Sequence, residues 1–233
     1  MSHSFIIPAY NEAVNIRNAI ERTRSYAQGL GADFEVIVVD DGSADDTRHI
    51  ARGLANQDSR IHLIEMPQNM GKGAAVKTGM LAARGEWRIF LDADLSTLPE
   101  EFEWFRTHLD SHDIIIGSRA LRESRILTHQ PPLRELSGKL FNLAVRGIVG
   151  LPFRDTQCGF KAFHSRTADL FNTQELHGWA FDVELLAKAR KRGFRIAEIP
   201  ITWKNDPTTT VKTSAAIRTL GDLVRIRSRL QNW

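Results

Sequence analysis

The chain has 233 residues, 42% of them hydrophobic and 25% charged, which suits one sizeable α/β domain with a continuous core. The formal charge of +3 is mild and the basic residues are dispersed until the tail, so the charge balance does not indicate a nucleic-acid partner. Cys158 is the only cysteine, which excludes an internal disulfide and a cysteine metal cluster and fits a reducing compartment. Because no low-complexity linker or internal repeat divides the sequence, residues 1–233 are expected to form a single domain.

Strand-like apolar runs alternate with helix-length amphipathic stretches through about residue 117. The predicted strands are His3–Ile7, Phe34–Val39, Ile61–Ile64, Trp87–Leu91 and Asp113–Ile116. The predicted helices are Asn11–Ala27, Asp45–Gln57, Lys72–Ala83 and Glu100–Leu109. This order predicts an α/β fold with a largely parallel sheet covered by helices.

The second half of the sequence is less regular. Its predicted elements are a helix Leu133–Val149 after a Pro-Pro break, a loop through Cys158, a helix Asp182–Arg192 and a strand pair near Arg195–Trp203. We expect this half to elaborate the first domain rather than to form another.

Three polar motifs follow predicted strands directly. Pro8-Ala9-Tyr10-Asn11-Glu12 follows the first strand, Asp40-Asp41-Gly42-Ser43 the second and Asp92-Ala93-Asp94 the fourth. In an open parallel sheet, ligands bind outside the carboxyl ends of the strands. The three motifs are therefore expected to converge on one crevice.

The acidic side chains of these motifs suggest a nucleotide and a metal. Asp92 and Asp94 can share Mg²⁺ or Mn²⁺ that also binds a diphosphate, although Asp pairs are also common in turns and helix caps. Asp40 and Asp41 can accept hydrogen bonds from a pyrimidine base or from ribose hydroxyls, while Ser43 can cap the next helix. Capping alone leaves the two adjacent acids without an evident partner.

A glycine-containing turn, Gln68–Gly73, leads into a predicted helix. The free backbone N–H groups near Gly71, the positive helix end and Lys72 favour phosphate, although the two glycines can also serve only for packing. Together with the acidic motifs, this turn describes a nucleotide diphosphate that departs from an attached sugar.

The order and spacing of these motifs resemble the inverting family 2 glycosyltransferases of GT-A (Rossmann-like) fold. Further segments resemble the polyprenyl-phosphate sugar transferases within that family, dolichyl-phosphate β-glucosyltransferases most of all: Gly117–Arg119, Asp155–Lys161, Trp179–Glu184 and Ile199–Trp203. The resemblance spans nearly the whole chain. It implies a mostly parallel sheet flanked by helices, and metal-dependent inverting transfer of a sugar, expected to be glucose from UDP-glucose, to a dolichyl or undecaprenyl phosphate.

The resemblance also implies roles for individual residues. The nucleotide-sugar would contact Pro8, Ala9, Tyr10, Glu12, Asp40, Asp41, Gly71, Lys72, Asp92 and Ala93, and the metal would be held by Asp94 and Asp92. The acceptor phosphate would contact Arg119, Arg134, Ser137 and Lys212, with a surface ion pair as the alternative role for either arginine. The catalytic candidates are Asp94, Arg119 and Asp182.

Asp182 is favoured over Glu184 as a group that orients a sugar hydroxyl or acts as a base. A phosphate acceptor is already an anion near neutral pH, so it needs little proton abstraction. Both acids lie in the first turn of a predicted helix, where a favourable interaction with the helix dipole is the alternative role.

The resemblance divides the domain into a nucleotide-sugar half, 1–118, an acceptor half, 119–210, and a basic amphipathic helix, 211–233. No apolar run has transmembrane length, and the early first strand leads us to expect neither a leader nor an anchor. We therefore expect peripheral contact with the cytoplasmic membrane face. Packing of the tail, or of Leu133–Val149, on the domain or on the twin subunit of a homodimer is the alternative.

Two other functions stay open at this point. One is sugar transfer to a soluble or saccharide acceptor, with Asp182 as the base. The other is a catalytically silent, nucleotide-binding interaction protein that retains only the fold.

Overall fold

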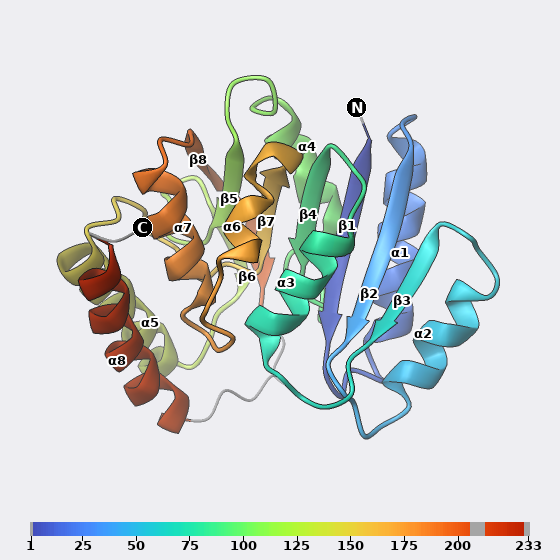
Figure 1. Ribbon diagram of the computed structural model, residues 1–233, viewed down its shortest axis with the longest axis horizontal. Helices are drawn as coiled ribbons and strands as arrows, with labels where there is room; N and C mark the ends of the chain where they lie inside the picture. The colour runs from blue at the N-terminus through green and yellow to red at the C-terminus, as the bar shows by residue number, and fades with distance from the viewer. Residues whose placement is uncertain (1, 206–212, 231–233) are drawn as a thin grey trace.

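The computed structural model describes the backbone of residues 2–205 and 213–230, and the side chains of all of these except 213–220. Its central sheet has seven strands in the order β3-β2-β1-β4-β7-β5-β8 (Figure 1). The strands are β1 (His3–Ala9), β2 (Phe34–Asp40), β3 (Ile61–Glu65), β4 (Trp87–Leu91), β5 (Ile114–Ser118), β7 (Phe160–His164) and β8 (Ile196–Pro200). All five strands predicted in the first half are therefore present.

The sheet is mostly parallel, as predicted. β1 pairs in parallel with β2 and β4, β2 with β3, and β5 with β8. The exception is β7, which is antiparallel to both neighbours, β4 and β5. The second residue of β7 is Lys161, which interrupts the apolar run. The apolar pattern therefore did not predict this strand.

Two strands are present near Arg195–Trp203, as predicted, but they do not pair with each other. β8 joins the central sheet beside β5, whereas β9 (Thr202–Lys204) forms a separate two-stranded sheet with β6 (Arg125–Thr128). Ile201 separates the two strands, and its backbone N–H donates to the carbonyl of Ser118. The chain therefore changes sheets within one residue.

Helices cover both faces of the central sheet. They are α1 (Ile16–Gly29), α2 (Thr47–Ala55), α3 (Lys72–Ala82), α4 (Phe102–Arg106), α5 (Pro132–Ala144), α6 (Asp169–Asn172), α7 (Phe181–Lys191) and α8 (Thr213–Arg229). Short turns of other helix types occupy Pro99–Glu101, Val145–Val149 and Ser165–Thr167. Figure 1 shows α3, α6 and α7 in front of the sheet and α1 on the far side.

Two hydrophobic cores result from the alternation of side chains along each strand. Ile6 and Phe90 point to the core that includes residues of α3 and α7. Phe5 and Ile89 point to the opposite core, which includes residues of α1 and α4. Burial on both faces explains why the parallel strands are nearly continuous apolar runs.

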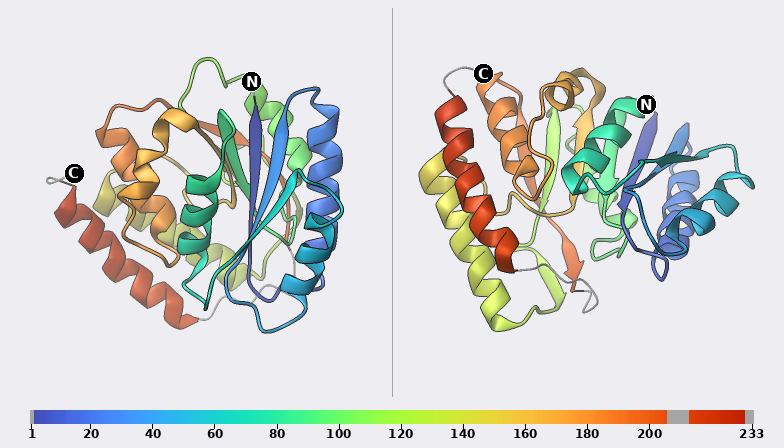
Figure 2. Two further views of the ribbon diagram at one scale, coloured as in Figure 1. Left: turned by 45° about the vertical axis from the view of Figure 1, so that its right-hand side comes forward. Right: turned by 60° about the horizontal axis from the view of Figure 1, so that its bottom comes forward.

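Helices α5 and α8 lie side by side at one end of the molecule (Figures 1 and 2). α8 packs onto the core through Leu223 and Ile226, which are buried, whereas α5 has no buried residue. Val224 of α8 is exposed. None of the helices in the described ranges is long and apolar enough to cross a membrane.

His3, at the start of β1, is buried against the edge of Phe102, with ring centroids 5.3 Å apart. Among the described residues, neither ring nitrogen has a hydrogen-bond partner. Burial lowers the pKa of His3 below 6.5. The unfolded chain therefore takes up this proton first as the pH falls, and the folded state loses stability below about pH 6.5.

The parent chain is expected to lose unfolding free energy when the pH falls from about 7.5 to about 5.5. We predict that this loss is smaller in His3→Leu, by about 0.5 kcal/mol or more. Urea denaturation at both pH values measures this difference, and other titrating groups cancel when the variant is compared with the parent chain. An equal loss in both proteins would show that His3 does not carry the effect.

Candidate functional site

A cleft of about 610 Å³ opens at the carboxyl ends of β1, β2, β4 and β5. The parallel register brings these ends level, because Ala9 at the end of β1 pairs with Asp40 at the end of β2. Of the residues expected at a site, the cleft is lined by Pro8, Ala9, Tyr10, Glu12, Asp41, Gly71, Lys72, Asp92, Ala93, Asp94, Arg119 and Arg134. The structure thus brings the three acidic motifs and both candidate arginines into one cavity.

The two adjacent acids after β2 have different surroundings. Asp40 is fully buried and does not line the cleft: its Oδ2 accepts from Arg48 Nε at 2.9 Å, and its Oδ1 accepts from the Ser43 backbone N–H. These contacts give Asp40 a structural role, and its contact with the nucleotide stays a prediction. Ser43 does not cap α2; its Oγ accepts from the Asn11 N–H at 2.9 Å.

Asp41 lines the cleft, and its carboxylate also holds the glycine turn. Its Oδ1 and Oδ2 accept from the backbone N–H groups of Met70 and Gly71 at 2.7 and 2.9 Å. Burial raises the pKa of Asp41, although these two hydrogen bonds oppose the shift. Each oxygen still has a second lone pair for a ligand.

Three backbone N–H groups of the glycine turn already have partners within the protein. Met70 and Gly71 donate to Asp41, and the N–H of Gly73 donates to the carbonyl of His177 at 2.8 Å. Gly71 has φ +96°, and a Cβ there would lie 2.7 Å from the same carbonyl oxygen, so glycine is required. The cation that this turn presents to the cleft is the side chain of Lys72.

Asp92 and Asp94 follow β4 and line the cleft together. Lys72 Nζ lies 2.5 Å from Asp92 Oδ1, while Asp94 Oδ1 accepts from the Ser96 N–H at 2.8 Å. Burial, reinforced by the charge of Asp92, raises the pKa of Asp94. Burial alone lowers the pKa of Lys72, but the nearby carboxylates, Asp92 foremost, outweigh it and raise that pKa.

The negative charges of Asp92 and Asp94 repel each other, and a hard divalent cation bound between them would relieve this repulsion. Within the described residues, no group of three or more His, Cys, Asp or Glu side chains is arranged to hold a metal. Asp92 and Asp94 would therefore supply only part of a coordination shell. This is the usual arrangement for Mg²⁺, which is commonly held by one or two carboxylates together with substrate phosphates.

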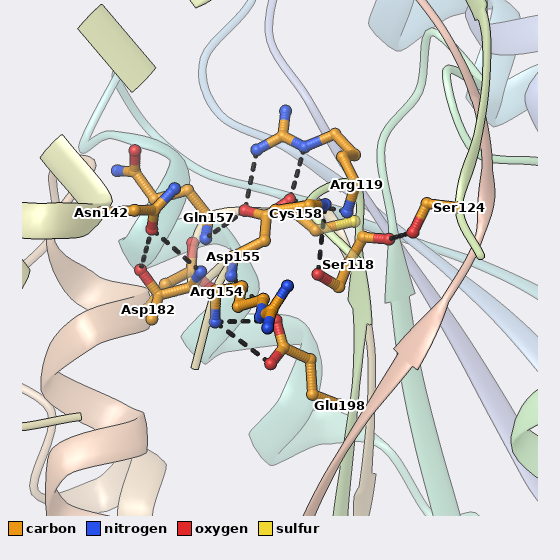
Figure 3. A network of polar contacts seen from close by, with 12 residues as sticks. Ser118, Arg119, Ser124, Asn142, Arg154, Asp155, Gln157, Cys158, Asp182 and Glu198 are labelled. Atoms are coloured by element: carbon orange, nitrogen blue, oxygen red, sulfur yellow. Dashed lines mark hydrogen bonds and ion pairs between the residues drawn. The ribbon is translucent and has the colours of Figure 1, made fainter. Parts of the chain in front are cut away.

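Arg119 follows β5 and forms a two-pronged ion pair with Asp155 (Figure 3). Its Nε and Nη2 donate to the two carboxylate oxygens at 2.7 and 2.9 Å. The guanidinium carbon also lies 5.5 Å from the ring centroid of Trp203. Burial alone raises the pKa of Asp155, but Arg119 outweighs it and holds that pKa below its ordinary value.

Asp182 and Ser137 do not line the cleft. Asp182 is 6% exposed and its Oδ1 accepts from the buried Lys161 Nζ at 2.7 Å. Burial raises its pKa despite this partner. The ion pair with Lys161 gives Asp182 a structural role, and its catalytic role stays a prediction. Ser137 is exposed on α5 and donates to the carbonyl of Arg134, and Lys212 lies outside the described residues.

Glu184, the less favoured acid of the same helix, holds the loop before α7. Its oxygens accept from the backbone N–H groups of Glu175 and Leu176 at 2.9 and 2.7 Å, and its Oε1 pairs with Lys188 at 2.5 Å. This loop carries His177 and Trp179, so Glu184 stabilises a wall of the cleft.

Several cleft residues received no role from the sequence. Trp179 lines the cleft with its ring centroid 5.6 Å from Lys72 Nζ, and Gln157 donates to the Trp179 carbonyl at 3.2 Å. Both, with Asp155, lie in segments that carried the family resemblance. Their contacts join positions 20 or more residues apart, and no local pattern signals such pairing. The other lining residues without a predicted role are Asn11, Asn69, Ala75, Ser96, Gln130, Gly159, Gly178, Trp203 and Asn205.

The fold and the cleft agree with a comparison of the sequence with known families. Residues 4–169 match the model of glycosyl transferase family 2, and this chain belongs to that family. It is 37% identical to the dolichyl-phosphate β-glucosyltransferase ALG5C of Trichomonas vaginalis, over 96% of this chain and 70% of that protein. It is 34% identical to the dolichyl-phosphate β-glucosyltransferase of Dictyostelium discoideum, over 97% of this chain and 74% of that protein. The chain is therefore a glycosyltransferase.

Solved structures share the fold. Glucosyl-3-phosphoglycerate synthase from Mycobacterium tuberculosis, in complex with UDP, aligns with a TM-score of 0.71 over 97% of this chain and 80% of that chain, at 20% identity. The same enzyme in complex with Mn²⁺, UDP-glucose and phosphoglyceric acid also aligns with a TM-score of 0.71. These similarities confirm the predicted GT-A fold.

Gly159 fixes the position of Asp92, because a Cβ at Gly159 would overlap the Asp92 carboxylate. We predict that Gly159→Ala displaces Asp92 and lowers the rate of sugar transfer by about tenfold or more. Gly178→Ala is the matched control, since Gly178 also lines the cleft but has no atom within 4 Å of an added Cβ. Initial rates, with thermal unfolding to check the fold, measure the effect; equal rates for both variants would contradict it.

Proposed function

We propose that this enzyme transfers glucose from UDP-glucose to the phosphate of a polyprenyl phosphate, with inversion at the anomeric carbon. The observation that carries the proposal is that one cleft is lined both by Asp92 and Asp94 and by Arg119 and Arg134. The first pair suits a metal-bound diphosphate and the second suits a phosphate acceptor. The names of the sequence relatives support the same donor sugar and a lipid-linked acceptor.

Residues 1–118 form the donor half of the proposed site. Pro8, Ala9, Tyr10, Glu12 and Asp41 surround the uridine. Asp92 and Asp94, with Ala93 between them, would hold Mg²⁺ or Mn²⁺, and the metal would neutralise negative charge on the diphosphate. Mn²⁺ is present with UDP-glucose in the structural relative, which supports this choice of metal. Lys72, now paired with Asp92, lies where it can also bind a diphosphate oxygen.

Residues 119–210 form the acceptor half. Arg119 and Arg134 bind the acceptor phosphate, whose oxygen attacks the anomeric carbon while the bond from that carbon to the diphosphate oxygen breaks and UDP leaves. Because the nucleophile arrives as an anion, no side chain has to remove a proton. Asp182 does not line the cleft and is paired with Lys161, which is consistent with a reaction that needs no base.

The acceptor lipid places the cleft beside a membrane, and we propose the cytoplasmic membrane face. Helix α5 carries Arg134 and four leucines whose exposed fractions are between 54% and 80%: Leu133, Leu136, Leu140 and Leu143. Such a row on a helix with Arg134, Lys139 and the nearby Arg146 suits the interface of an anionic bilayer. Helix α8, which lies beside α5, would add basic residues.

A soluble phosphorylated acceptor is the second candidate function. One observation favours it: the structural relative was solved with phosphoglyceric acid, a small phosphorylated acid. Arg119 and Arg134 suit any phosphate monoester, so these two arginines do not discriminate between the two acceptors. The exposed leucines of α5 favour the lipid.

Transfer of labelled sugar tests the function directly. UDP-glucose, UDP-galactose, UDP-N-acetylglucosamine and GDP-mannose are incubated with polyprenyl phosphate or phosphoglyceric acid, with Mg²⁺, Mn²⁺ or a chelator. We expect metal-dependent, organic-extractable product from UDP-glucose, and an approximately 100-fold lower rate for Asp94→Asn. Water-soluble product alone would favour the second candidate, and full activity of Asp94→Asn would remove the metal role from this residue.

The leucines of α5 give a separate prediction. We expect the double variant Leu136→Glu/Leu140→Glu to bind anionic vesicles about tenfold more weakly than the parent chain. The reason is that the variant lacks two leucine side chains that would be buried in the bilayer interface. The control is Leu81→Glu/Trp104→Glu, which adds the same charge at exposed apolar residues of α3 and α4. Co-sedimentation with vesicles measures both, and equal binding by the two variants would exclude α5 as the docking surface.

A further inference from the structure

Asp155 accepts four hydrogen bonds and is 1% exposed (Figure 3). Two come from the Arg119 side chain, one from the Arg119 backbone N–H at 3.0 Å and one from the Gln157 backbone N–H at 3.2 Å. Asp155 does not itself line the cleft, whereas Arg119 does. Its carboxylate can therefore affect substrate only through the residues that it holds.

The ion pair leaves one edge of the guanidinium available. Arg119 uses Nε and Nη2 toward Asp155, and Nη1 makes no hydrogen bond with the described residues. Figure 3 shows the third guanidinium nitrogen pointing away from Asp155. Trp203 lies beside the same guanidinium and also lines the cleft. Asp155 and Trp203 together restrict a long side chain that would otherwise sample many rotamers.

We propose that Asp155 is a positioning residue, which holds Arg119 with its remaining N–H edge toward the cleft and thereby sets the affinity for the acceptor phosphate. The inference rests on the proposed function, in which Arg119 binds that phosphate. Preorganisation raises affinity because the side chain is ordered before the ligand arrives. The negative charge of Asp155 opposes phosphate binding, so the proposal requires the orientation of Arg119 to outweigh this repulsion.

A second carboxylate supports the segment that carries Asp155. Glu198 of β8 accepts from the backbone N–H groups of Arg154 and Asp155, at 2.9 to 3.1 Å. Gln157, on the other side, links the segment to the Trp179 carbonyl. The position of Arg119 is thus fixed by β5, by the loop before β7 and by β8.

The test compares Asp155→Asn with the parent chain, since asparagine keeps the shape but cannot accept from both prongs of Arg119. Farnesyl phosphate, a short prenyl monophosphate, serves as the probe, and ¹⁵N NMR of the Arg119 Nε–H group reports both its order and its binding of the probe. In the parent chain we expect a resolved, slowly exchanging signal that shifts on titration. In Asp155→Asn we expect that signal to broaden or vanish and the Kd to rise about tenfold, with UDP affinity unchanged.

Two further variants separate positioning from a general structural effect. Asp58→Asn breaks an equivalent two-pronged pair, with Arg60 Nε and Nη2 at 2.9 and 2.7 Å, at the opposite edge of the sheet, and should leave the probe Kd unchanged. In an Arg119→Lys background, which has no planar fork to orient, Asp155→Asn should change the acceptor KM less than about twofold.

The outcomes distinguish this inference from the proposed function. If farnesyl phosphate does not shift the Arg119 signal in the parent chain, the acceptor role of Arg119 fails. If it does so but Asp155→Asn binds the probe equally or more tightly, Arg119 binds phosphate without positioning by Asp155. An equal rise in the Kd for UDP would assign Asp155 a general structural role and would also overturn the inference.

Discussion

The cleft depends on how four buried carboxylates are compensated at one edge of the sheet. Asp40, Asp155 and Asp182 each have a cationic partner, Arg48, Arg119 and Lys161 respectively, and Asp41 accepts two backbone N–H groups. A charge buried without such partners would be strongly destabilising. Because most of these partners come from distant segments, the same pairs that satisfy the charges also fix the relative positions of the loops around the cleft.

Strand β7 extends this constraint to the proposed acceptor half. It lies antiparallel between β4 and β5, so the loop before it meets the carboxyl ends of both neighbours. That loop contributes Asp155, which holds Arg119, and Gly159, which lies against Asp92. Lys161, within the strand, pairs with Asp182 and donates to the Cys158 carbonyl at 2.5 Å. One strand of five residues thus organises both sides of the cleft.

The sequence allowed the parallel half of this architecture to be predicted, because residues such as Ile37 and Phe90 lie in apolar runs typical of buried strands. It also located Asp92, Asp94 and Arg119, since the carboxyl ends of parallel strands meet at one edge. It did not reveal β7, because Lys161 becomes acceptable in the core only through its ion pair with Asp182. Nor did it separate Asp40 from Asp41, because the choice depends on Arg48 and on the amides at 70 and 71. What local patterns miss are contacts between segments.

The distribution of charge in the cleft explains why an ionised acceptor suits it. The acidic residues that line it in the described structure are Glu12, Asp41, Asp92 and Asp94, and all lie within residues 1–118, the proposed donor half. A neutral hydroxyl acceptor beside Arg119 and Arg134 would need a base. Asp182, the predicted candidate, does not line the cleft and is in an ion pair with Lys161. A phosphate acceptor removes that requirement but brings a second anion close to the departing diphosphate. The arginines on one side, and Lys72 with a divalent cation on the other, would offset the repulsion between these two anions, so the proposed reaction would require both groups of cations at once.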